Sequence, residues 1–459
     1  MRPRAASLGP GKRGDAMTQN WLWMTAADLG RGIAAGRINA MELTEAFLDA
    51  GSAHEHGPRI YARLTPRRAR SMAIAAADRA RAGRRIGPLD GVPLSWKDNI
   101  DASGAACEGG TALLKGRIPT EDAPILHTAT AGGLVCLGKT HLSELAFSGL
   151  GLNPVTATPP CVNDATAVPG GSSSGAAASV AFGIAPAAIG TDTGGSVRIP
   201  AAWNDLVGLK TTSGRLPTKG IIPLCRRFDT PGPLARSVED CALILAALEG
   251  RPAPDLTGVT LQGLRLGVLE TVALDDLRDG PATGFHTATD RLARAGARIE
   301  RVLAPEVAEA MMLAATLFTA EAYGLWRERI EAAPHLMYAR ILERFRSGGS
   351  VTAADYVAAW SRLETLRATW ADRSAAYDAI LLPTSPILPP HAQRLLDDDA
   401  YCVAENLLAL RNTRIGNLMG GCALTLPTGQ PSVGISLMAG PGQEVRLLRI
   451  GAAAERALG

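Results

Sequence analysis

The spacing of apolar residues divides the chain into an N-terminal helical stretch and a longer stretch in which short apolar runs alternate with helices. Between Trp23 and Ala82, apolar residues recur at three- and four-residue intervals, which predicts helices. Farther along, "GVPLSWKDNID", "GGLVCLGKT" and "APAAIGTD" are short apolar runs bounded by turn residues, with segments such as "GAAASVAFG" between them. This alternation predicts an α/β fold: a single large mixed, mostly parallel sheet covered by helices on both faces.

The same pattern continues beyond a Pro-rich break at 250–258. The segments "LRLGVLE", "TGFHTATDRLARAG" and "ARIERVL" predict a strand, a helix and a second strand, and "YDAILLPTSPILPP" predicts a later strand and loop. The break therefore resembles a loop between two halves of one sheet. We expect a single domain over 17–459, with a helical N-terminal layer at 17–85 and a helical region at 305–376.

Composition and charge narrow the class of protein. Hydrophobic residues at 46% and charged residues at 20% are ordinary for a soluble globular protein. Four basic residues and one acidic residue in positions 1–16 account for the whole formal charge of +3, so the rest of the chain is neutral. Residues 1–16 are expected to be a disordered basic arm, and Met1 and Met17 both remain as translation starts. A neutral body argues against binding to nucleic acid.

Cysteine usage and hydropathy predict the compartment. The seven cysteines are scattered and contain no C-x-x-C pair, which fits reduced thiols in the cytoplasm. The longest run of small apolar residues, 176–190, is shorter than the roughly 20 residues that cross a bilayer. No membrane span is expected.

Two short motifs match known patterns only formally. "GGLVCLGKT" has the spacing of a phosphate-binding loop ending at Lys139 and Thr140, but "LVCL" has the composition of a buried strand and a helix precedes it rather than follows it. "GSSSG" matches a nucleophile elbow with Ser173 at its centre. A poor strand precedes it, and the histidines that follow have no catalytic surroundings: His286, His335 and His391. We interpret the first motif as a core strand and reject a Ser-His-Asp enzyme.

A third set of residues supplies a complete chemistry for amide hydrolysis, which needs an activated nucleophile, a proton carrier and donors for the oxyanion. Ser196 follows two glycines in "GTDTGGSV" and would attack the carbonyl. Ser172 would relay the proton between Ser196 and Lys97, the base. The backbone N–H groups of the oxyanion hole would belong to Thr193, Gly194, Gly195 and Ser196.

These motifs resemble those of the amidase signature family, the Ser-Ser-Lys amide hydrolases. The intervals of 75 residues from Lys97 to Ser172 and 24 to Ser196 agree with the family's layout, and the resemblance covers 20–455. It is densest in the signature core, 86–247. It implies a cis peptide at Ser172, with Ser173 as a hydrogen-bond partner of Lys97. "PLDGVPLSWKDNID", "YDAILLPTSP" and "NLMGGCALTLPTG" also match.

Residues around the catalytic set receive supporting roles. Asp192 is expected to brace the glycine turn, and Lys139 and Arg198 to form structural hydrogen bonds. Arg226-Arg227 depart from the small polar residues usual in the family; they would either bind an anionic substrate or lie in solvent. The candidate substrate pocket comprises Phe147, Leu150, Cys225, Arg226, Arg227 and Thr230.

The resemblance implies an amidase that converts a small carboxamide to a carboxylate and ammonia through an acyl-enzyme on Ser196. No metal or organic cofactor is expected. The alternative is the glutamine-hydrolysing subunit of a tRNA-dependent amidotransferase, which uses the same three residues to release ammonia for a partner. The expected partner is a small-molecule amide rather than nucleic acid or a membrane, and a homodimer is left open.

Overall fold

One continuous sheet of eleven strands extends through the described residues, 20–459, of the computed structural model. The strand order is β1-β3-β2-β4-β6-β5-β10-β11-β9-β7-β8. The strands are β1 (Tyr61–Leu64), β2 (Pro93–Lys97), β3 (Val135–Thr140), β4 (Ala187–Asp192), β5 (Val207–Lys210), β6 (Thr230–Ala235), β7 (Arg265–Leu269), β8 (Arg298–Val302), β9 (Ala379–Pro383), β10 (Cys422–Pro427) and β11 (Gly434–Ala439). The Pro-rich loop at 250–258 leads from one part of this sheet to another, as predicted.

The mixed α/β sheet is confirmed, although fewer of its pairings are parallel than expected. Parallel pairings join β2 to β3 and β4, and β7 to β8 and β9. The six pairings that involve β1 or lie between β4 and β9 are antiparallel. Strands buried on both faces read as continuous apolar runs whatever their direction, so the sequence pattern does not distinguish the two arrangements.

Helices cover both faces of the sheet, and alternate residues of β4 show how. Ala187 and Ile189 pack into the cluster that contains the apolar side chains of α9 and α16, whereas Ala188 packs against α7. The helices that cover the sheet are α6 (Pro124–Ala131), α7 (Ser174–Ala181), α8 (Arg198–Trp203), α9 (Val238–Glu249), α10 (Asp279–Arg294) and α16 (Glu444–Leu458).

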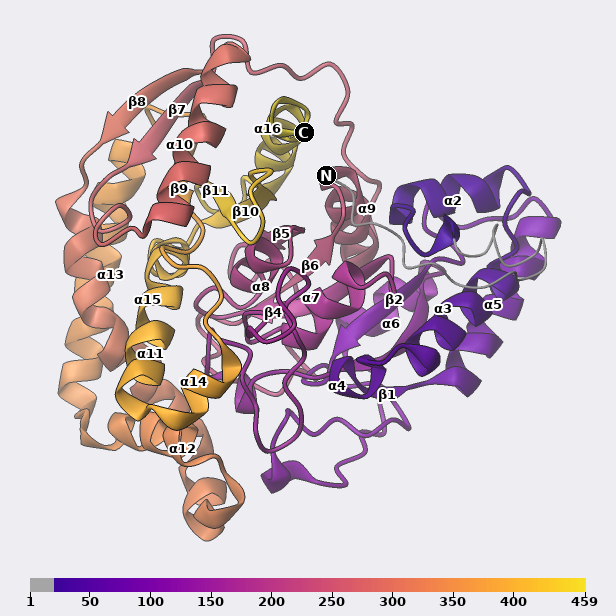
Figure 1. Ribbon diagram of the computed structural model, residues 1–459, viewed down its shortest axis with the longest axis horizontal. Helices are drawn as coiled ribbons and strands as arrows, with labels where there is room; N and C mark the ends of the chain where they lie inside the picture. Colours follow the sequence, from indigo (N-terminus) through magenta and orange to yellow (C-terminus); the bar gives the residue numbers. More distant parts are fainter. Residues whose placement is uncertain (1–19) are drawn as a thin grey trace.

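Two groups of helices lie at opposite ends of the molecule (Figure 1). The N-terminal group contains α2 (Ala26–Ala34), α3 (Ala40–Ala53), α4 (Gly57–Ile60) and α5 (Pro66–Arg81). Within the stretch expected to be helical, Tyr61–Leu64 instead pairs with β3 as an edge strand. The other group contains α11 (Pro305–Ala332), α12 (Ala339–Arg346) and α13 (Ala353–Ser374), followed in the chain by α14 (Ala392–Asp397) and α15 (Asp399–Leu418). The predicted arm, 1–16, lies outside the described residues.

Short 3-10 helices connect some of these elements: η1 (Ala112–Leu114), η2 (Glu144–Ala146), η3 (Pro334–Leu336) and η4 (Ser347–Ser350). The second of them leads directly to Phe147, at the candidate site. Leu145 and Ala146 there have positive φ values of 46° and 60°, a backbone conformation that is uncommon for residues with a side chain.

Candidate active site

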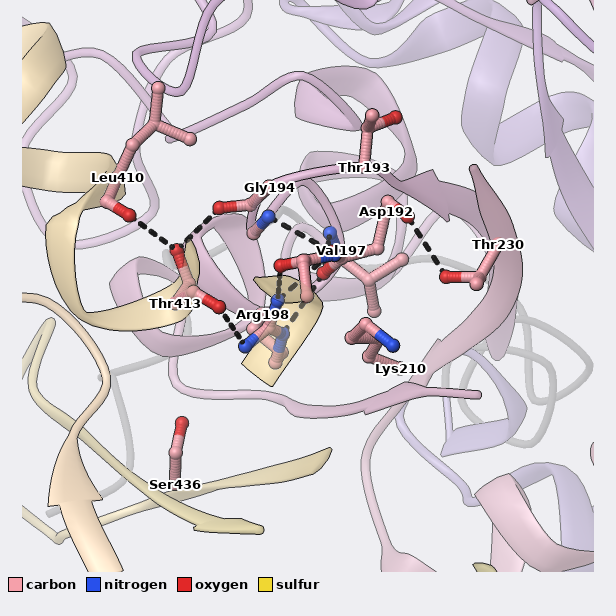
Figure 2. Close-up of polar contacts among 12 residues, drawn as sticks. Asp192, Thr193, Gly194, Val197, Arg198, Lys210, Thr230, Leu410, Thr413 and Ser436 are labelled. Carbon is pink, nitrogen blue, oxygen red and sulfur yellow. Dashed lines mark hydrogen bonds and ion pairs between the residues drawn. The ribbon is translucent and has the colours of Figure 1, made fainter. Parts of the chain in front are cut away.

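The candidate site is built on the turn between β4 and α8. The Asp192 carboxylate, at the end of β4, accepts hydrogen bonds from the backbone N–H groups of Gly195 (2.9 Å) and Val197 (3.2 Å). Arg198 donates to the same carboxylate from Nε and Nη2, both at 3.0 Å (Figure 2). These four bonds fold the turn back over the end of the strand. This geometry is the one that a bracing role for Asp192 requires.

Asp192 keeps its charge although it is completely buried. Burial alone opposes its ionisation, but the charges of Arg198 and Lys210 and the hydrogen bonds it receives outweigh that effect, so its pKa lies well below the ordinary value. One of these bonds comes from Asn417 Nδ2 at 2.9 Å. The turn therefore rests on a buried, fully paired ion pair.

Thr413 of α15 holds the other side of the turn. Its hydroxyl donates to the Gly194 carbonyl at 2.8 Å, and its own carbonyl accepts from Arg198 Nη1 at 2.7 Å (Figure 2). Gly195 has a φ of +136°, and a Cβ at this position would lie 2.0 Å from Thr413 Oγ1. Both the backbone conformation and the close approach of α15 therefore require glycine here.

Lys97, the last residue of β2, is fully buried beside the two serine segments. Its Nζ donates to Ser172 Oγ at 2.7 Å and to Thr191 Oγ1 at 2.9 Å. Burial lowers the pKa of this ammonium to about 7, although Asp192 and Asp229 favour the charged form. Near neutral pH about half of the molecules therefore hold a neutral amine next to the Ser172 hydroxyl.

Ser172 and Ser173 point to different partners. The Gly171–Ser172 peptide is cis, as the family resemblance implies. The Ser173 hydroxyl bonds the backbone carbonyl (3.2 Å) and N–H (3.3 Å) of Thr191 instead of Lys97. The prediction that Ser173 contacts Lys97 is thus wrong, because Thr191 occupies that position with its own hydroxyl.

Ser196 lies in a pocket with its hydroxyl free. Its backbone carbonyl accepts a hydrogen bond from the Ser173 N–H at 3.2 Å, which holds the two serine segments together. In residues 20–459 the Ser196 hydroxyl forms no hydrogen bond with Ser172 or with any other protein group, and it contributes to the lining of the pocket. It is therefore available to a ligand.

Three of the four predicted oxyanion donors line the pocket: the residues are Thr193, Gly194 and Ser196. The backbone N–H groups of these three have no acceptor within the described part of the chain. The N–H of Gly195, by contrast, donates to Asp192. The inclusion of Gly195 among the oxyanion donors is therefore corrected: its role in the structure is to shape the turn.

The pocket has a volume of about 320 Å³ and apolar and basic walls. The wall side chains are Phe147, Leu224, Phe318, Arg344, Leu410 and Arg414. Phe147 was predicted from the sequence. Leu150 instead lines an adjoining cavity of about 770 Å³, which shares Ser148 and Arg344 with the pocket.

The remaining pocket predictions are not supported, since none of these residues lines the pocket. Thr230 donates to the carbonyl at the end of β4 at 2.9 Å (Figure 2), and Cys225 is buried with its thiol outside the cavity. Arg226 is exposed. Arg227 lies outside the pocket because its guanidinium packs over the ring of Trp360, 4.8 Å from the centroid.

The two formal motifs have structural roles. Lys139 belongs to the buried strand β3, where its Nζ lies 3.6 Å from Asp98 and donates to the Ile100 carbonyl, so the core-strand interpretation is confirmed. No histidine lines the pocket around Ser196 among residues 20–459. Within the same residues, no helix is long and apolar enough to cross a membrane.

Comparison with known proteins gives consistent matches along nearly the whole chain. The family model described as Amidase matches residues 42–448. The chain is 36% identical over 457 residues to 2-amino-5-chloromuconic acid deaminase of Comamonas testosteroni, covering 95% of this chain and 97% of that protein. It is 31% identical to the glutamyl-tRNA(Gln) amidotransferase subunit of Chloroflexus aggregans, covering 95% and 96%. A crystal structure of an amidase superposes with a TM-score of 0.86 at 29% identity, covering 95% and 100%.

Proposed function

The chain belongs to the amidase family, whose members hydrolyse C–N bonds, and we propose that it cleaves a small carboxamide through an acyl-enzyme on Ser196. In this proposal Lys97 is the base and Ser172 carries the proton between them. The N–H groups of Thr193, Gly194 and Ser196 bind the oxyanion.

The observation that carries this proposal is the environment of Lys97. An ordinary lysine is charged at neutral pH and cannot accept a proton. Burial brings the pKa of Lys97 to about 7, and its Nζ lies 2.7 Å from Ser172 Oγ. A general base has to lie within hydrogen-bond reach of the proton it accepts and to have a pKa near the working pH, and Lys97 meets both conditions.

Acylation would proceed in two stages. A bond forms between Ser196 Oγ and the carbonyl carbon while the Ser196 proton passes to Ser172 and the Ser172 proton passes to Lys97. The C–N bond then breaks, and the proton returns through Ser172 to the departing nitrogen, which leaves as ammonia. Water repeats the sequence on the ester and releases the carboxylate.

The relay also imposes a condition on the side chains. The hydroxyls of Ser172 and Ser196 do not hydrogen-bond directly in the described part of the chain, whereas Ser172 is held by Lys97. Rotation of the Ser196 hydroxyl toward Ser172 would complete the relay. Catalytic hydrogen bonds of this kind often tighten only when the substrate binds.

Labelling with a fluorophosphonate, followed by peptide mass spectrometry, tests the nucleophile. We expect one adduct on Ser196, no labelling and no turnover in Ser196→Ala, and substantial labelling and turnover in the matched control Ser173→Ala. Ser173 is equally buried and lies in the same site, but its hydroxyl bonds only backbone groups. An adduct on Ser173, or full activity of Ser196→Ala, would refute the assignment.

The similarity to amidotransferase subunits leaves a second candidate, the release of ammonia from glutamine for a partner protein. Purified chain assayed alone separates the two. A stand-alone amidase hydrolyses simple amides without a partner, whereas an amidotransferase subunit depends on its complex. Because the relative of 36% identity is named for a muconic acid, 2-aminomuconate belongs in the substrate panel beside aliphatic and aromatic amides.

A further inference from the structure

Two arginines, from helices that are distant in the sequence from the catalytic residues, line the pocket of Ser196. Arg344 lies on α12 and Arg414 on α15. Arg344 also lines the adjoining cavity, so it stands where the two spaces meet. The proposed reaction uses neither side chain.

Contacts with the pocket walls fix the position of each arginine. A Cβ built on Gly194 would lie 3.5 Å from Cγ and 4.0 Å from Nε of Arg414, which places this side chain against the proposed oxyanion turn. The guanidinium carbon of Arg344 lies 4.4 Å from the ring centroid of Phe147, and its Nη1 donates to the Phe147 carbonyl at 2.9 Å. Both side chains therefore stand next to the position of a bound acyl group.

The positive charge of this pair is not compensated by the protein. Within residues 20–459, no carboxylate oxygen lies within 4.0 Å of either guanidinium, and Arg414 donates no hydrogen bond to a protein group. Arg198 shows the contrasting arrangement, because both of its bonds to Asp192 are 3.0 Å long.

Both arginines remain charged at neutral pH. Burial and the neighbouring charge of Arg414 lower the pKa of Arg344 to about 9, and burial lowers that of Arg414 to about 10. Partly buried positive charges without a counter-charge are unfavourable, and an anion that enters the pocket relieves that cost.

We propose that Arg344 and Arg414 together bind a carboxylate on the acyl part of the substrate, so that the preferred substrates are monoamides of dicarboxylic acids. A guanidinium binds a carboxylate through two parallel N–H···O bonds, which also orient the bound molecule. The apolar walls formed by Phe318 and Leu410 suit the carbon chain between the carboxylate and the amide. This inference rests on the proposed function and moves the anionic contact expected of Arg226-Arg227 to a different pair of arginines.

Matched substrates test the charge preference. Malonamate, succinamate, glutaramate and adipamate present the carboxylate at increasing distance from the amide. In a methyl ketone amide, such as 4-oxopentanamide for succinamate, a methyl group replaces one carboxylate oxygen and the shape is nearly unchanged. We expect the best anionic substrate to exceed its neutral partner by roughly 10- to 100-fold in kcat/KM.

Arg344→Gln and Arg414→Gln test the residues. Each should lower kcat/KM for the anionic substrate by about 10-fold or more while changing that for the neutral partner by less than about 3-fold. Arg414→Lys should recover part of the loss, because it restores the charge without the fork. Arg346→Gln is the matched control, since Arg346 lies on the same helix but is exposed and pairs with Glu331.

A binding measurement separates failure of this inference from failure of the proposed function. Calorimetry with succinate and glutarate on Ser196→Ala needs no turnover, and the affinity should fall when Arg344→Gln or Arg414→Gln is added. If Ser196 is labelled but anionic and neutral substrates are cleaved equally, or if both lose activity equally in the arginine variants, the carboxylate site is refuted and the amidase proposal stands. If no amide is cleaved, the calorimetry alone decides the carboxylate site.

Discussion

Replacing Thr191 by Val tests whether the ionisation of Lys97 sets the pH dependence of the reaction. Thr191 Oγ1 accepts a hydrogen bond from Lys97 Nζ at 2.9 Å and another from Asn99 Nδ2 at 3.0 Å. An acceptor at this distance favours the charged ammonium over the neutral amine. Valine has nearly the same shape without the acceptor, so the substitution should lower the pKa of Lys97.

The size of the shift follows from the hydrogen bond that is removed. A hydrogen bond to a charged group contributes about 1.5 to 3 kcal/mol, and one pKa unit corresponds to about 1.36 kcal/mol. The lower value applies because the Thr191 carbonyl remains 3.4 Å from Nζ. The pKa should therefore fall from about 7 by about one unit.

The assay is kcat/KM between pH 5 and 9.5 on an amide that does not ionise in that range. Wild type should rise along one ionisation and level off, with about a tenth of the plateau at pH 6. Thr191→Val should reach about half of its own plateau at that pH. Thr211→Val is a suitable control, since this buried hydroxyl donates to a backbone carbonyl of β6 at 2.9 Å and not to Lys97.

The direction of the shift decides the outcome. Removing an acceptor can only destabilise the ammonium, so the midpoint has to move to lower pH if Lys97 is the titrating base. An unchanged midpoint, or one that moves to higher pH, would show that another group controls the rate and would refute the role of Lys97.

Two further predictions concern stability. Asp192→Asn leaves Arg198 buried without its counter-charge and should lower the free energy of unfolding by about 3 to 5 kcal/mol, measured by urea denaturation; a change below about 1 kcal/mol would contradict the bracing role. Lys97→Met should abolish turnover yet raise the free energy of unfolding at pH 7 by up to about 4 kcal/mol, because the folded state lowers the pKa of Lys97 from 10.5 to about 7. The folded state gives up this proton before the unfolded state does, so wild-type stability gains from Lys97 as pH rises from 7 to 10.5. The advantage of the variant should shrink over that window, and equal advantages at pH 7 and 9.5 would contradict the buried-lysine explanation.

The sequence predicted the parts of the site that depend on local chemistry. The segments of Lys97, Ser172 and Ser196 combine small residues with polar side chains at the ends of apolar runs, and the structure brings Lys97 and Ser172 into contact. Thr191 was missed, although its position next to Asp192 on the same strand was a usable signal. Ser173 was misassigned because a cis peptide bond and a turn together decide where neighbouring side chains point.

The pocket walls were much less predictable. Phe318, Arg344 and Arg414 lie on helices whose sequences look like those of any packed helix, and only the tertiary fold brings them to Ser196. Arg227 was placed in the pocket by sequence proximity, but Trp360 of α13 holds it outside. The direction of individual strands was hidden for a similar reason, since pairing depends on which distant segment lies alongside.

The division of labour between the chain segments has a consequence for how such a protein diversifies. The groups proposed to carry the reaction come from positions 97–198, whereas Phe318, Arg344, Leu410 and Arg414 come from helices that follow the middle of the chain. Heritable changes in those helices can alter which compounds are accepted while the bond-breaking apparatus stays constant. A library randomised only at these four positions should therefore yield new selectivities on an unaltered reaction, provided that Thr413, which anchors α15 to the turn, is kept.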